Sequence, residues 1–273
     1  MTAADQRSIL VKNRRGPKVE RVAVEPPAWA REEWIDEGSL REEASKAAQR
    51  AANDEGPRGR VPRTELAPEV AEELARVAAA GRQARYQERL ASAAEALDRG
   101  RFADARRMVQ PVIRDLPDMA FGHEISGLSL YRMGQWRKAA AELETARLLD
   151  GSVNHHAVLA DCYRAMRRYH EVEQLWRELR AASPAPALLA EGRIVAAGAL
   201  ADQGDLLGAL TTMAKALEVP KKPRDFHLRQ WYVLADLLDR SGDVIKARRY
   251  FGLVFEADRE FADVKERLRT LGR

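Results

Sequence analysis

The sequence predicts an all-α fold of repeated helical hairpins, and three observations lead to this expectation. Ala and Leu dominate the apolar residues, while aromatic residues make up 6% and charged residues 32% of the chain, a mixture that favours helices. A short segment that is typical of a turn recurs at intervals along the chain. No segment shows the apolar and polar alternation of a strand. With 273 residues and 45% hydrophobic content, the chain can bury a core.

Charge and cysteine content argue against several classes of protein. The 46 basic and 42 acidic residues leave a net charge of +4, a weaker bias than nucleic-acid binders usually show. The single cysteine, Cys162, cannot form an intramolecular disulfide, and the first residues lack an apolar signal-peptide core, so we expect a cytoplasmic protein. No run approaches the roughly 18 consecutive apolar residues of a membrane span, so we expect no membrane insertion.

Residues 1–65 differ from the rest, and we expect a largely disordered charged arm with a short helix near 39–53. A basic stretch comes first, and an acidic stretch that contains two tryptophans follows. The tryptophans fit either a helix that packs on the rest of the chain or a partner-binding motif that orders on contact. The arm residues with expected contacts are Arg14, Arg15, Lys18, Trp29 and Trp34.

The second part of the chain, residues 66–273, begins with a helical segment. A proline near its start, acidic residues in its first turn, and Val70, Leu74 and Val77 at helical spacing predict a helix over 68–80 that caps the front of the repeats.

The repeated turn is clearest where GRFADA at 100–105 recurs as GQWRKA at 134–139, a period of 34 residues. Degenerate copies begin at Arg167, Gly204 and Gly242, so five copies are visible. A small residue lies seven positions before each turn: Ala93, Gly127, Ala160, Ala197 and Ala235. A second position just after the turn is also small, with Ala105, Ala139, Ala209 and Ala247, and Val172 as the exception.

In this period, turn and pair of small positions, the chain resembles the tetratricopeptide repeat (TPR) family over about residues 84–273. The resemblance implies an α-solenoid of about five helical hairpins, in which each hairpin buries its apolar faces by stacking on the next. Flanking capping helices complete the expected fold. Its core should contain Leu130, Leu143, Tyr163, Trp176, Leu200, Met213, Leu238 and Phe251.

Three features modify this expectation. Pro111 lies inside the second helix of the first copy and should kink it. The segment VPKKPRDF at 219–226 should form an additional loop. At the end of the chain, Phe261, Val264 and Leu268 at helical spacing predict an amphipathic helix that caps the array.

The TPR resemblance implies that a partner lies in the concave groove lined by the first helix of each repeat. The groove positions lack the Lys and Asn of the family's carboxylate clamp, which disfavours a chaperone C-terminus as the partner. Their acidic and apolar side chains instead suit a basic or amphipathic segment, although they also fit ordinary solvated surface charges. The expected partner-binding residues are Glu124, Leu128, Tyr131, Asp161, Arg164, Ile194, Asp202, Tyr232, Asp236 and Asp239.

Residues 7–21, the basic arm, are a further candidate occupant of the acidic groove in cis, where they would compete with a partner. Signatures of catalysis are missing: the sequence has no phosphate loop, no dinucleotide fingerprint, no HExxH and no CxxC, so we predict no cofactor, no metal and no catalytic residue. The pair His155 and His156 lacks the further ligands that a metal needs, and Cys162 is expected to be a buried packing thiol.

The leading hypothesis is therefore a non-catalytic scaffold that binds a protein partner through its groove. The alternative is an RNA- or ribosome-associated factor whose basic arm contacts phosphates. An enzyme on a helical-repeat scaffold has no supporting motif and ranks below both.

Overall fold

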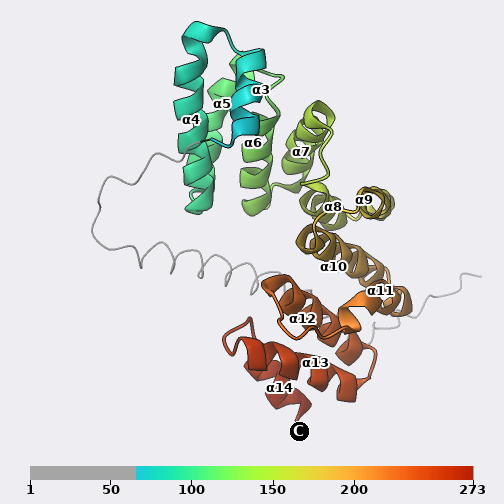
Figure 1. Ribbon diagram of the computed structural model, residues 1–273. Coiled ribbons are helices and arrows are strands. Elements are labelled where there is room, and N and C mark those ends of the chain that lie inside the picture. Colours follow the sequence, from blue (N-terminus) through green and yellow to red (C-terminus); the bar gives the residue numbers. More distant parts are fainter. Residues whose placement is uncertain (1–65, 273) are drawn as a thin grey trace, which may run out of the picture. The chain divides into compact units, whose positions relative to one another are not determined.

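The computed structural model describes residues 66–272, and within this range the chain forms twelve α-helices and no strand. Ten of the α-helices pair as five successive hairpins (Figure 1). The hairpins are α4 (Ala80–Asp98) with α5 (Phe102–Asp115), α6 (Ala120–Arg132) with α7 (Trp136–Asp150), α8 (His156–Ala165) with α9 (Tyr169–Ala182), α10 (Pro186–Asp202) with α11 (Leu206–Thr212), and α12 (Asp225–Arg240) with α13 (Val244–Ala257). They are hairpins 1 to 5 below.

The hairpins stack in chain order. The second helix of each hairpin packs on the first helix of the next, as α5 does on α6 and α7 on α8. The first helices also contact one another in sequence, from α4 to α6, α8, α10 and α12. Because every hairpin covers its neighbour, the apolar stripes that no single hairpin can bury are removed from water by stacking.

The five predicted turns are structurally equivalent. Gly100, Gly134, Gly204 and Gly242 all adopt positive φ, between 72° and 86°. Arg167 occupies the same place in hairpin 3 with φ 58°, so the degenerate copy keeps the left-handed turn without the residue that adopts it most easily. This equivalence confirms the repeat that the sequence predicts.

The small positions mark close helix approaches. Gly127 of α6 is buried, and a Cβ at this residue would lie 2.7 Å from Leu143 Cγ and 3.2 Å from the Leu143 backbone nitrogen of α7. The equivalent residues Ala93 and Ala197 are fully buried. These small residues therefore allow the close approach of the two helices that the TPR resemblance implies.

The core consists of three clusters that follow one another along the chain. The first joins α3 to α6, the second joins α6 to α10, and the third joins α10 to the C-terminal helix. Most of the predicted core residues are buried, but Trp176 and Leu200 are only partly buried. They line an open surface pocket of about 340 Å³ between α9 and α10, to which Ala196 and Ala199 also contribute.

Both ends of the array carry an additional helix. At the front, α3 (Pro68–Val77) ends earlier than predicted because Ala78 is extended, and α4 begins at Ala80. At the other end, α14 (Val264–Leu271) buries Val264 and packs on α13. These are the flanking capping helices of the predicted fold.

In two hairpins the sequence of the second helix departs from the repeat pattern. Helix α5 continues through Pro111 from Phe102 to Asp115 without a break. Helix α11 is only seven residues long and is followed by a 3-10 turn, η2 (Ala214–Leu217), and then by the predicted loop. Pro220 and Pro223 in that loop have no backbone N–H and prevent the helix from continuing.

Candidate functional site

The candidate site is the first-helix face, defined here as the surface that α4, α6, α8, α10 and α12 share. The ten expected partner-binding residues all lie on four of these helices, α6, α8, α10 and α12. Because the first helices contact one another in order, equivalent residues of neighbouring hairpins are close enough to interact.

Arg164 of α8 is the centre of a polar cluster that joins three hairpins. Its guanidinium binds Asp202 of α10 through two hydrogen bonds of 2.7 and 3.2 Å and lies 3.7 Å from Asp161 on its own helix. Asp161 in turn accepts a 2.6 Å hydrogen bond from the Tyr131 hydroxyl of α6. Four of the expected residues are therefore brought together, and a two-point contact between Arg and carboxylate fixes their relative geometry.

Gly198 of α10 makes room for this arginine. A Cβ at Gly198 would lie 2.7 Å from Arg164 Cζ, so any side chain would displace the guanidinium. The Arg164 side chain is only 10% exposed, and Asp202 is 20% exposed. Hydrogen bonding rather than free solvation therefore determines the position of this cation.

A second cluster joins α12 to the capping helix α14. Arg267 of α14 donates to Asp236 at 3.0 Å and lies 4.0 Å from Asp239, two further expected residues. Arg267 also lies 3.3 Å from Asp263, which accepts a hydrogen bond from the Tyr232 hydroxyl. The sequence predicts only a capping helix here and not the pairing of Arg267, because that pairing depends on how α14 packs rather than on a local pattern.

The remaining expected residues occupy the same face without joining these clusters. Glu124 of α6 lies 3.2 Å from His155 Nε2 at the start of α8. Leu128 and Ile194 are partly buried and pack against the second and third core clusters. Each carboxylate predicted to attract a basic segment therefore already has a cation or histidine beside it.

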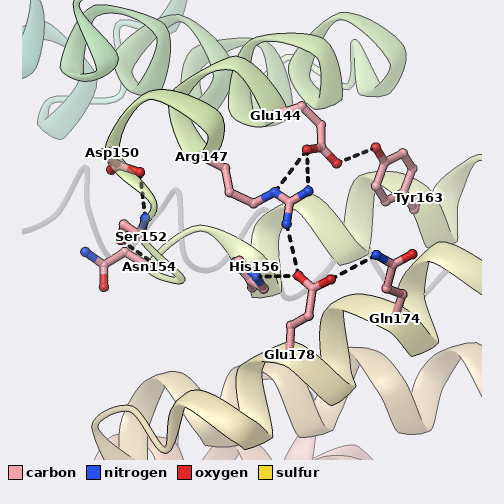
Figure 2. A network of polar contacts seen from close by, with 9 residues as sticks. All are labelled: Glu144, Arg147, Asp150, Ser152, Asn154, His156, Tyr163, Gln174 and Glu178. Carbon is pink, nitrogen blue, oxygen red and sulfur yellow. Dashed lines mark hydrogen bonds and ion pairs between the residues drawn. The ribbon is translucent and has the colours of Figure 1, made fainter.

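A polar network ties hairpins 2 and 3 together (Figure 2). Arg147 of α7 donates to Glu144 at 3.0 Å and to Glu178 of α9 at 2.9 Å. Glu178 also lies 3.1 Å from His156 Nε2, and Tyr163 donates to Glu144 at 2.8 Å. Burial and this bond to a carboxylate raise the pKa of Tyr163 to about 12. No pattern in the sequence signals this network, because it depends on the register between hairpins.

Two buried histidines have opposite electrostatic environments. Burial lowers the pKa of His156, and the nearby Arg147 guanidinium adds to this shift. His123 has Glu142 2.6 Å from Nδ1 and the Pro117 carbonyl oxygen 2.9 Å from Nε2, and the bond to Glu142 raises its pKa. Both neighbours of His123 only accept hydrogen bonds, so the imidazolium form satisfies both.

Cys162, His155 and His156 lie in structural surroundings. Cys162 is fully buried, and burial raises the pKa of its thiol to about 12. His155 and His156 contact different carboxylates, Glu124 and Glu178. Within residues 66–272, no group of three or more His, Cys, Asp or Glu side chains is arranged to hold a metal ion.

The arm predictions concern residues that the structure does not describe. The expected disorder of residues 1–65, the helix near 39–53 and the contacts of the basic arm all lie outside the described range. So do the candidate contact residues Arg14, Arg15, Lys18, Trp29 and Trp34.

The described hairpins define a TPR-type α-solenoid. The chain is similar to a thermophilic TPR protein of Thermus thermophilus, whose crystal structure superposes with a TM-score of 0.53 over 68% of this chain and 97% of that chain, at 16% sequence identity. No protein-family model and no curated protein matches the sequence. At this identity the similarity establishes the fold alone. None of the described helices is both long and apolar enough to cross a membrane.

Proposed function

We propose that this chain is a non-catalytic scaffold that binds a segment of a partner protein along its first-helix face. The observation that supports the proposal most directly is the cluster around Arg164, in which Tyr131, Asp161 and Asp202 come from α6, α8 and α10. One surface with matched polar groups thus extends over three hairpins, as an extended or helical ligand requires.

The preferred ligand is a basic or amphipathic segment. Five of the expected residues are carboxylates, and each has a cation or histidine of the same chain near it. A basic partner would compete with Arg164 and Arg267 for these acids, while Leu128 and Ile194 offer partly exposed apolar surface between them. Exchange of one ion pair for another favours specificity over raw affinity.

The absence of catalysis is part of the same proposal. The Cys162 thiol is buried, with a raised pKa, and is a poor nucleophile. The histidines of α6 and α8 are held by carboxylates rather than directed into a cavity. The single cysteine is in keeping with a reducing compartment, and we place the protein in the cytoplasm.

Charge reversal on one face provides the test. The variant Glu124→Lys with Asp239→Lys changes the first-helix face. The matched control Glu173→Lys with Glu256→Lys makes the same charge change on α9 and α13. Full-length wild type and both variants would be used for affinity purification, each with and without nuclease.

We expect the first-helix variant to bind its partners at least about tenfold more weakly than wild type, which corresponds to about 1.4 kcal/mol of binding free energy. The control should bind them as wild type does. Equal recovery by both variants would contradict binding through this face. Loss of every partner on nuclease treatment would instead indicate an association through nucleic acid.

A further inference from the structure

Helix α3 bridges the first helices of hairpins 1 and 2. It packs on α4, and its Glu73 carboxylate accepts hydrogen bonds from the backbone N–H groups of Ala120 at 2.5 Å and Phe121 at 3.4 Å. These are the first two amides of α6, and amides at a helix start have no partner within their own helix. A carboxylate there satisfies them and also interacts favourably with the helix dipole.

The rest of the α3 contact is apolar. Leu74 and Ala78 are 3% and 7% exposed, and they belong to the same core cluster as Tyr86 and Leu90 of α4. Val70 and Val77 pack against this cluster, so Val70, Leu74 and Val77 lie on one stripe of α3, and Ala78 follows the helix directly. One apolar stripe and one carboxylate are thus the features that the surface recognises in α3.

Helix α3 packs mainly on one helix, α4, at the front end of the described hairpins. It has ten residues and no side-chain hydrogen bond at its N-cap, Ala67. An isolated helix of this length is marginal in water, so α3 depends on its docking contacts. In contrast, α4 also packs on α5 and α6, and these contacts do not involve α3. Release of α3 is therefore compatible with an intact array.

We propose that hairpins 1 and 2 carry a docking surface for an amphipathic helix of a partner protein, and that α3 occupies this surface in cis. The partner helix carries an acidic residue directly before a large aliphatic residue, with further aliphatic residues four before and three after it. The acid binds the Ala120 and Phe121 amides in place of Glu73, and the aliphatic residue fills the Leu74 site. The inference rests on the proposed scaffold function and names a partner class and a regulation for its front end.

The test uses the full-length chain and a fluorescein-labelled peptide of residues 66–79 as the probe. Leu74→Asp weakens the docking of α3, and Ala75→Asp is the matched control because Ala75 is exposed on the same helix. By fluorescence anisotropy we expect the Leu74→Asp protein to bind the peptide at least about tenfold more tightly than wild type or the control. Peptides that carry Glu73→Gln or Leu74→Asp should bind at least about tenfold more weakly to this variant.

Hydrogen exchange of the full-length proteins provides the second measurement. We expect the α3 amides to exchange faster in Leu74→Asp than in the control, while the α6 amides regain protection when the peptide binds. Released α3 without peptide binding would overturn the inference, and so would an α3 that stays protected in Leu74→Asp. Either failure leaves the test with Glu124 and Asp239 unaffected, so the two proposals can be refuted separately.

Discussion

Replacement of Gly127 by alanine tests whether close helix approach sets the hairpin geometry. The new Cβ would lie 2.7 Å from Leu143 Cγ, 2.8 Å from Cδ2 and 3.2 Å from the backbone nitrogen. The side chain can rotate, but the backbone nitrogen can move only if α6 and α7 separate. Overpacking of this kind costs about 1–3 kcal/mol. Alanine in place of glycine inside a helix offsets this by about 0.8–1.0 kcal/mol.

Gly252→Ala in α13 is the matched control, because no atom lies within 4 Å of its added Cβ. Both variants gain the same helix propensity, so the difference between their unfolding free energies isolates the crowding at Gly127. We expect Gly252→Ala to be more stable than wild type and Gly127→Ala to lie about 1–3 kcal/mol below Gly252→Ala. Urea unfolding followed by circular dichroism measures both. Equal stability of the two variants would refute the reasoning.

The remaining predictions concern a turn, a histidine and the thiol. Arg167→Gly should raise the unfolding free energy by about 1 kcal/mol in urea titrations, since glycine adopts φ 58° without the Cβ penalty; no change would mean that the turn is unstrained. Because the pKa of His123 is raised in the folded state, its contribution to the unfolding free energy is fully present below pH 6.5. This contribution is lost as the pH rises through the pKa of the folded state. His123→Gln should therefore flatten the fall in unfolding free energy above pH 6.5, and an unaltered slope would contradict the assignment. Cys162, with its pKa of about 12, should resist a disulfide-exchange thiol reagent in the native protein and react in urea; reaction in the native state would show that the helix opens.

The hairpins could be predicted from the sequence because their determinants are local and repeat with the chain. A turn residue with positive φ and a small residue seven positions earlier recur together. Once one turn is recognised, the same pair of positions therefore locates the other turns. Even the degenerate copy at Arg167 keeps the backbone conformation of its neighbours. Burial of Leu143 and Phe251 follows from the same register.

The contacts between hairpins were harder to predict because they depend on relative register and on rotamers. Nine of the ten expected residues of the first-helix face are at least partly exposed, whereas Tyr232 is 2% exposed and belongs to the third core cluster. The cation or histidine beside each acid was not foreseen. Arg164 reaches Asp202 only because Gly198 has no side chain. Likewise, Trp176 was expected in the core, but it is only partly buried and lines an open surface pocket together with two alanines of α10.

The ion pairs of the first-helix face connect neighbouring helices, so the proposed ligand would alter these connections when it binds. Arg164 joins α8 to α10, and Arg267 joins α12 to α14. A basic ligand that captures Asp202 or Asp236 removes a tie between neighbouring helices at the moment of binding. Under the proposed function, the spacing of hairpins 3 and 4 would then depend on whether a ligand is bound.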